Sequence, residues 1–242
     1  IGGKTVLNIA AFNAITGKAK DWAPFANSTV STIVVNGSTV YFGGAFDFVG
    51  DSSRNYIAAV DTNGTILSFN PNADSDVLTL SLDGNTMYAG GYFSEIGGVV
   101  RNQIAALDAT TGIATAWNPN MSSAVTSMVV SGNTVYAGGY FTTVGDSARN
   151  HIAAIDKTSG IATDWKANAD EPVFALAKSG ATIYAGGDFF SINDSARNKI
   201  AAIDSATGNA TTWNPSIDLY VQAIAVSGNL VYVGGGFSEV GN

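Results

Sequence analysis

The sequence lacks cysteine and contains a single histidine, His151, among 242 residues. Without cysteine there can be no disulfide, thiolate metal site or cysteine nucleophile. One histidine leaves almost no room for a histidine-based triad and none for a multi-histidine zinc site. No apolar run approaches the roughly 18 residues of a membrane-spanning helix, so membrane insertion is not expected.

Charge is also scarce and of one prevailing sign. Charged residues make up 12% of the chain, and 19 acidic against 11 basic side chains give a net charge of −8. An acidic surface disfavours nucleic acids and anionic membranes as partners. What replaces the charge is 28 glycines and a hydrophobic share of 46%. That mixture is typical of many short strands joined by tight turns.

The dominant feature of the sequence is a tandem repeat. The tract Val135-Tyr136-Ala137-Gly138-Gly139-Tyr140-Phe141 recurs around Gly43, Gly90, Gly186 and Gly234, at successive spacings of 47, 48, 48 and 48. The tract Arg149-Asn150-His151-Ile152-Ala153-Ala154-Ile155-Asp156 recurs at Arg54, Arg101 and Arg197, and is degraded near Val6. Repeats therefore begin near residues 1, 49, 96, 144 and 192, and residues 1–242 form one domain.

Each repeat predicts four antiparallel strands. Around the third copy of the glycine tract they are residues 125–130, 134–141, 152–155 and 161–165, separated by turn residues such as Ser131-Gly132. The Gly-Gly pair inside the second strand indicates a bulge or a close backbone approach. Four strands in about 48 residues, repeated in tandem, predict an all-β, five-bladed β-propeller.

The phase of the repeat predicts how such a propeller closes. Residues 218–242 supply the two inner strands of blade five, and residues 1–25 supply its two outer strands. Pairing the N- and C-terminal strands in this way removes open sheet edges that favour aggregation.

The motifs Tyr-Ala-Gly-Gly-x-Phe, Gly-Asp-Ser-Ala-Arg-Asn, Ile-Ala-Ala-x-Asp and Trp-Asn-Pro resemble the β-propeller repeats of large bacterial cell-surface and secreted proteins, a domain family of unknown function. They are more distantly similar to the repeats of fungal cortical polarity-marker proteins. The resemblance implies a propeller in an extracellular or cell-surface setting, either as a monomer or as part of a longer surface protein. It implies no reaction.

Columns that are the same in every repeat are interpreted as scaffold. An aromatic column, expected to pack between blades, comprises Trp22, Phe69, Trp117, Trp165 and Trp213. An acidic column at strand ends, expected to cap turns, comprises Asp61, Asp108, Asp156 and Asp204, with Asn13. An arginine column, expected to tie loops to the neighbouring backbone, comprises Arg54, Arg101, Arg149 and Arg197. Sugar stacking on the tryptophans and ligand binding by the arginines are the alternatives.

Loops that differ between repeats are the better candidates for function. The candidate ligand-binding residues lie before each innermost strand, at the predicted mouth of the channel: Asn27, Asp74, Asp76, Asp170, Glu171, Asp218 and Tyr220. Ser122 fills the corresponding position of the remaining repeat. Such oxygen-rich loops leave Ca²⁺ open as an alternative, although their spacing matches no calcium-binding loop motif. No cofactor and no metal site is otherwise predicted.

The sequence thus favours a non-catalytic, surface-exposed binding or display module with a glycan or protein ligand. A purely structural spacer is the first alternative. The second is a glycosidase-like enzyme, in which Asp76, Asp170, Glu171 and Asp218 would supply the two carboxylates that glycoside hydrolysis needs. Repeats so alike leave little room for an asymmetric cleft, so no catalytic residue is assigned.

Overall fold

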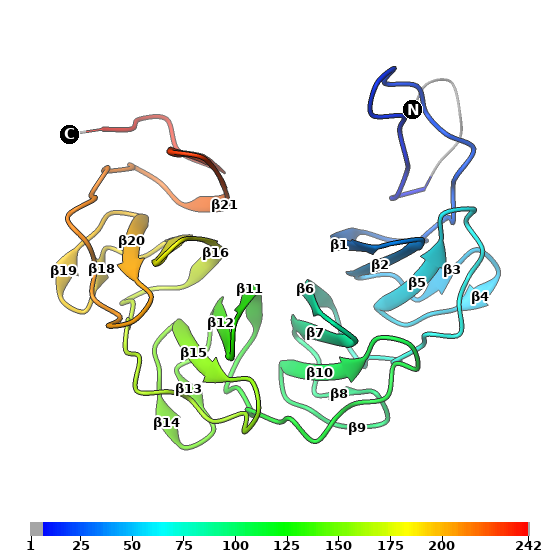
Figure 1. Ribbon diagram of the computed structural model, residues 1–242, viewed down its shortest axis with the longest axis horizontal. Helices are drawn as coiled ribbons and strands as arrows, with labels where there is room; N and C mark the ends of the chain where they lie inside the picture. The colour runs from blue at the N-terminus through cyan, green and yellow to red at the C-terminus, as the bar shows by residue number, and fades with distance from the viewer. Residues whose placement is uncertain (1–6, 242) are drawn as a thin grey trace. The chain divides into compact units, whose positions relative to one another are not determined.

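The computed structural model describes residues 7–241, which form strands and turns (Figure 1). The chain divides into two compact units. The first comprises the residues up to Arg101 together with Ala105–Ala116, and the second comprises Asn102–Ile104 and the residues from Trp117 onward. Within the described range, no helix is long and apolar enough to cross a membrane.

The strands repeat in the order expected from the sequence. The first strand of each repeat is β1 (Val30–Asn36), β6 (Val77–Asp83), β11 (Val125–Ser131), β16 (Val173–Ser179) or β21 (Val221–Ser227). The second is β2 (Thr39–Gly44), β7 (Thr86–Gly91), β12 (Thr134–Gly139), β17 (Thr182–Gly187) or β22 (Leu230–Gly235). The third is β5 (Ile57–Asp61), β10 (Ile104–Asp108), β15 (Ile152–Asp156) or β20 (Ile200–Asp204).

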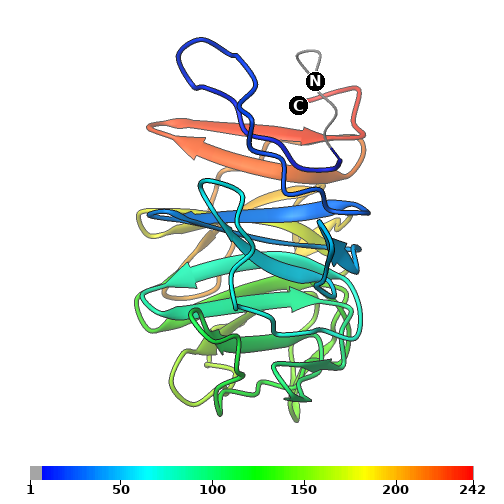
Figure 2. The same ribbon diagram turned by 90° about the vertical axis from the view of Figure 1, so that its right-hand side faces the viewer.

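These strands build three-stranded sheets with the second strand in the middle: β1-β2-β5, β6-β7-β10, β11-β12-β15 and β16-β17-β20. The strands β21 and β22 form a two-stranded sheet, seen in Figure 2 as a long antiparallel hairpin. We call each sheet with its loops a blade. Its loop end is the end where the first strand begins and the second strand finishes, as at Val125 and Gly139.

Two features of each blade differ from the predicted pattern. The fourth strand is only a short segment joined to the third strand by one bridge, as at Ile155↔Ala162. Each three-stranded blade also has an unpredicted pair of two-residue strands at its loop end: β3 (Phe48–Val49) with β4 (Ser52–Ser53), β8 (Glu95–Ile96) with β9 (Val99–Val100), β13 (Thr143–Val144) with β14 (Ser147–Ala148), and β18 (Ser191–Ile192) with β19 (Ser195–Ala196). These hairpins are too short to carry a periodic hydrophobic signal.

The Gly-Gly pair has the role that the sequence predicts. The pairing of β11 with β12 shifts register between Val125 and Ser127, opposite Gly139 and Gly138. A Cβ on Gly139 would lie 2.1 Å from the carbonyl oxygen of Ala124 in its own blade. A Cβ on Gly138 would lie 2.7 Å from Val173 Cγ1 of the next blade. The first glycine therefore allows neighbouring sheets to approach, and the second allows the bulge.

The aromatic column packs between blades within each unit, as predicted. Trp22, Trp117 and Trp165 are buried, with at most 8% of each side chain exposed. Their indole nitrogens donate to the carbonyl oxygens at the ends of third strands 39 residues further on, Asp61, Asp156 and Asp204, at 2.9–3.0 Å. A buried tryptophan N–H needs such a partner, so the column joins consecutive blades.

The acidic and arginine columns also serve the scaffold. Asp156 Oδ1 accepts hydrogen bonds from the backbone of Thr158 and Ser159, which lowers the pKa of Asp156. Arg149 donates to the carbonyl oxygens of Ala148 and Thr163, both at 2.6 Å, and the other three arginines make the same pair of contacts. Each arginine thus ties the short hairpin of its blade to the fourth segment.

The predicted closure of blade five involves segments from both units. In the second unit, no third strand is paired with β22 among the described residues. In the first unit, residues near the N-terminus form only the bridge Phe12↔Ala19, and Val6 lies outside the described residues. The blade count and the closure stay predictions.

Candidate functional site

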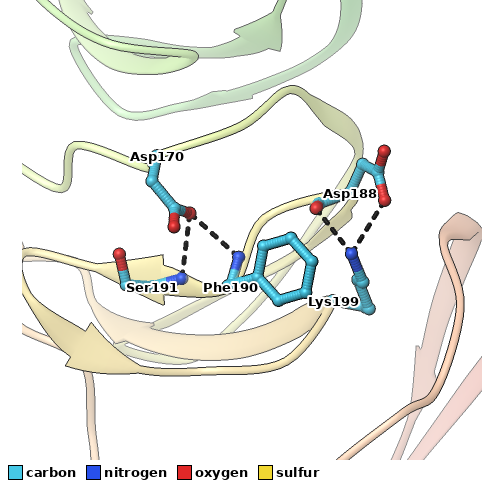
Figure 3. Close-up of polar contacts among 5 residues, drawn as sticks. All are labelled: Asp170, Asp188, Phe190, Ser191 and Lys199. Atoms are coloured by element: carbon cyan, nitrogen blue, oxygen red, sulfur yellow. Dashed lines mark hydrogen bonds and ion pairs between the residues drawn. The ribbon is translucent and has the colours of Figure 1, made fainter.

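The predicted loop column consists of oxygen acceptors that hold together the loop end of each blade. Asp170, just before β16, accepts hydrogen bonds at 2.9 Å from the backbone N–H groups of Phe190 and Ser191, which follow β17 (Figure 3). Asp74 and Asp218 bind the corresponding N–H groups in the same way and add a serine hydroxyl, Ser94 at 2.5 Å and Ser238 at 2.6 Å.

Uncharged members of the column make the same contacts. Asn27 Oδ1 accepts from the backbone of Asp47 and Phe48, both at 3.1 Å. Ser122 Oγ accepts from Thr142 and Thr143, both at 3.0 Å. Because Asn, Asp and Ser share one acceptor role, the variation along this column needs no ligand to explain it.

The hydrogen bonds also set the protonation of the three carboxyl groups. The side-chain hydroxyl of Ser238 and the N–H of Glu239 lower the pKa of Asp218 to about 2. Burial opposes the same effect at Asp74 and Asp170, but the hydrogen bonds from residues 94–95 and 190–191 outweigh it and the pKa of each falls. These groups are therefore ionised acceptors at neutral pH.

The other three candidates occupy the same loops but make separate contacts. The backbone carbonyl of Asp76 accepts from Tyr92 N at 2.9 Å, and Glu171 is exposed. Tyr220 covers Gly236, where a Cβ would lie 2.5 Å from the tyrosine ring. No hydrogen bond between two of the seven candidates is found in the described chain. Within residues 7–241, no three His, Cys, Asp or Glu side chains are grouped so that they could hold a metal ion.

Exposed aromatic side chains gather at the loop ends, which the sequence comparison of columns did not emphasise. Within residues 7–241 the exposed aromatics are Phe12, Phe25, Phe48, Tyr92, Tyr140, Phe190, Tyr220 and Tyr232. All except Phe12 and Tyr232 belong to loop ends. In the second unit, Tyr140 of one blade contacts Phe174 of the next, with ring centroids 5.8 Å apart.

A second variable column was missed by the sequence reasoning. The residue before the Ile-Ala-Ala tract is Asn8, Tyr56, Gln103, His151 or Lys199, and each has a φ of 59–66°. Comparing the repeats column by column at this position would have found it. Lys199 is buried, donates to the carbonyl and carboxylate oxygens of Asp188 at 2.8 Å, and lies 3.5 Å from the centre of the Phe190 ring (Figure 3).

The lone histidine, His151, contacts the backbone of its own blade. His151 Nδ1 lies 3.2 Å from the carbonyl oxygen of Gly139 within its own blade. Its backbone N–H donates to Phe141 O at 2.8 Å. Both contacts hold the left-handed residue between the second and third strands.

Comparison with known proteins supports the repeat fold. The family model described as outer membrane protein assembly factor BamB matches residues 53–235. No curated protein matches the chain in sequence. The computationally designed Ika8 protein is similar in structure, with a TM-score of 0.61, 18% identity, and coverage of 93% of this chain and 61% of that one.

Two further solved structures are similar at the same identity of 18%. The computationally designed Ika4 protein has a TM-score of 0.50 and covers 74% of this chain and 92% of its own. A chain of the mitotic checkpoint complex has a TM-score of 0.59 and covers 88% of this chain and 61% of its own. This chain therefore spans less than two thirds of two of these relatives. Together with the repeated sheets, the similarities identify a β-propeller repeat protein.

Proposed function

Because the chain belongs to the family described as outer membrane protein assembly factor BamB, we propose that it is a non-catalytic module that binds a protein partner through its loop ends. The observation that carries the proposal is the placement of exposed aromatics. Aromatic side chains are enriched in protein interfaces, and exposed apolar groups on successive loops of one unit, such as Tyr140, Phe190 and Tyr220 of the second, are typical of binding sites.

The polar side chains of the repeated columns also support a non-catalytic role, because their hydrogen bonds go to the backbone of their own blades. The arginines bond to backbone carbonyls, and the aspartates of both acidic columns accept backbone N–H groups. A catalytic acid, base or nucleophile needs a polar group available to a substrate. The repeats instead present aromatic surface at variable positions, which suits recognition better than catalysis.

Five blades closed by the terminal strands form part of this proposal. In the complete blades, three of the four tyrosines that match Tyr232 are 3–7% exposed, namely Tyr41, Tyr88 and Tyr136, and the fourth, Tyr184, is half-buried. Tyr232 itself is 56% exposed. Phe12 is 48% exposed, although the matching residues Val60, Leu107, Ile155 and Ile203 are fully buried. Residues 8–13 correspond to a third strand and are bridged to a fourth segment, but no second strand is paired with them among the described residues. The second strand β22 is paired with the first strand β21, but no third strand is paired with it in the described chain.

The register of the complete blades predicts how these two halves pair. By analogy with Thr134↔Asp156 and Tyr136↔Ala154, Leu230 pairs with Asn13 and Tyr232 with Ala11. The pairing buries Phe12 and Tyr232, which are the two exposed aromatics away from the loop ends. We further propose that the module works in the cell envelope or outside the cell, as the similarity to bacterial surface repeats implies.

A peptide selection tests the protein-binding function. A displayed library of random peptides is selected on the folded protein, and the dissociation constants of enriched peptides are measured by fluorescence polarisation. The test variant is Tyr92→Ser with Tyr140→Ser. The other repeats have Ala45, Asp188 and Gly236 at this position, so the blade forms without an aromatic residue there. Loss of two interface aromatics is expected to weaken binding by about tenfold or more.

The matched control is Ile161→Ser. This isoleucine is 64% exposed and lies in the turn that follows the third strand, at a position where other repeats have Thr65 and Asn209. The control should bind peptides as the parent does. Equal binding by parent and test variant would overturn the assignment, and so would a glycan array on which sugars, and no peptides, require Tyr92 and Tyr140.

A further inference from the structure

Polar clefts recur at one position of the repeat, beside the loop ends, and neither lining includes an aromatic side chain. In the first unit, a cleft of about 450 Å³ is lined by residues that include Asn55, Asn72, Asp74, Glu95, Gly98 and Ile113. In the second unit, a cleft of about 340 Å³ is lined by residues that include Asn150, Asn168, Asp170, Ser191, Asn193 and Asp194. We call them the Asn55 cleft and the Asn150 cleft.

The two clefts are built by matching residues. Asn55 and Asn150 are the asparagines of the Arg-Asn motif, and Asn72 and Asn168 follow the turn that leaves the aromatic column. In the Asn55 cleft, Asn55 Nδ2 donates to Asn72 Oδ1 at 2.8 Å. In the Asn150 cleft, Asn150 N donates to Asn168 Oδ1 at 3.1 Å. A further repeat has the pair Asn102 and Asn120, joined at 2.7 Å.

The first and last repeats lack the pair of asparagines. At the matching positions of the first repeat the chain has Leu7 and Phe25, which can offer no amide groups. In the last repeat, Asn198 Nδ2 donates to Ser216 Oγ at 3.1 Å. An amide pair is therefore present in three consecutive repeats and is not required for the blade to form.

The chemistry of the linings defines the ligand. Neither lining contains Lys, Arg or His in the part of the chain that the structure describes, and each contains two acidic side chains. Such a site disfavours phosphates, sulfates and uronic acids by repulsion. An Asn amide carries two N–H donors and a carbonyl acceptor, so paired amides beside carboxylates suit hydroxyl groups, which both donate and accept.

The size of the clefts favours a single small unit. Small-molecule sites occupy about 300–1,000 Å³, and these clefts lie at the lower end of that range. Their walls are short polar side chains and backbone rather than the apolar pockets that anchor peptide side chains. We propose that the clefts are repeated subsites for a neutral sugar residue, so that the module binds a glycan as well as a protein.

The turn that borders the Asn150 cleft is held by one of its own side chains. Asn193 and Asp194 have φ values of 46° and 61°, where the matching residues of the first unit are Gly97 and Gly98. Asn and Asp adopt this left-handed conformation more readily than other non-glycine residues. Asn193 is held by hydrogen bonds from its amide to Lys166 O and Gly208 O at 2.7 and 3.1 Å.

The test uses isotope-labelled intact protein and three probes: methyl β-glucoside, methyl N-acetyl-β-glucosaminide and, as the acidic control, methyl β-glucuronide. A single sugar residue should bind with a Kd on the order of 1 mM. The neutral glycosides should shift the backbone amide signals of Asn72, Gly98, Asn168 and Asp194, and the glucuronide should not. The absence of any shift with either neutral probe, or stronger shifts with the glucuronide, would overturn the proposal.

A variant extends the test to repeated binding. Asn72→Gly keeps the left-handed backbone of that residue, which has a φ of 53°, and Asn168→Ala removes the second amide. Since several weak sites act together on a multivalent surface, the double variant should be retained at least about tenfold less by a surface coated with the neutral sugar. The control Asn229→Ala removes an amide from the turn between β21 and β22, where the preceding repeat has Ala181, and should be retained like the parent.

The two proposals fail separately. Tyr92→Ser with Tyr140→Ser should lose peptide binding and keep the sugar-induced shifts at the clefts. If sugar-induced shifts fall instead on the aromatic loops and persist in the double cleft variant, the clefts are not the sugar sites. If random peptides shift the cleft amides and sugars do not, the clefts belong to the protein interface.

Discussion

Replacing Trp117 separates the two contributions that the aromatic column makes to stability. The side chain is 6% exposed, and its indole N–H donates to Asp156 O at 3.0 Å. Trp117→Ala removes both the buried ring and the hydrogen bond, at an expected cost of about 3–5 kcal/mol. Trp117→Phe keeps most of the ring, as Phe69 does naturally in this column, and loses the hydrogen bond at a cost of about 1 kcal/mol.

Urea unfolding followed by circular dichroism measures both variants, because the signal of the sheets does not depend on the tryptophan itself. For a domain of this size, each 1 kcal/mol lowers the melting temperature by about 2–4 °C. Trp165→Phe is the matched control, since Trp165 makes the same contact with Asp204 O at 3.0 Å. If alanine and phenylalanine cost the same, the indole hydrogen bond would be the whole effect and the packing argument would be wrong. If alanine left stability unchanged but weakened ligand binding, the column would be a binding platform.

Three further predictions follow from the same structure. Asn13→Cys with Leu230→Cys should form an intramolecular disulfide in the monomer, because the proposed register places these two residues opposite each other. The control pair Ala11→Cys with Leu230→Cys is two residues out of register and should form none. A disulfide-linked dimer would contradict closure within one chain. Adding Ca²⁺ should leave the melting temperature unchanged, because Asp74, Asp170 and Asp218 already bind N–H groups of their own blades; a rise that vanishes on their neutralisation would restore the metal site. The pKa of Asp218 is about 2 in the folded protein, and its ordinary value is 3.8. The ionised carboxylate therefore stabilises the fold fully above pH 3.8, and this contribution is lost as the pH falls through 2. The melting temperature of Asp218→Asn should fall less than that of the parent when the pH is lowered over this range.

The amino-acid sequence by itself determined the features that repeat with the period of the blades. The strands, the Gly-Gly bulges, the turn-capping aspartates and the buried tryptophans are all predictable, because each depends on neighbours within a few residues or on the same contact made once per repeat. Asp156 illustrates the local case, since its partners Thr158 and Ser159 are two and three residues away. Trp117 illustrates the repeated case, since its partner is 39 residues away in the next copy.

Only the tertiary structure decided what the variable loops do. Asp170 reads as a free carboxylate in the sequence, but its partners are the N–H groups of Phe190 and Ser191, brought to it by the hairpin of β16 and β17. The fourth segment forms only one bridge with the third strand, and a hydrogen bond from the arginine side chain is a second contact that holds it to the blade. The exposed aromatics and the amide pairs of the clefts likewise come from loops that are distant along the chain, and no local pattern records which of them meet.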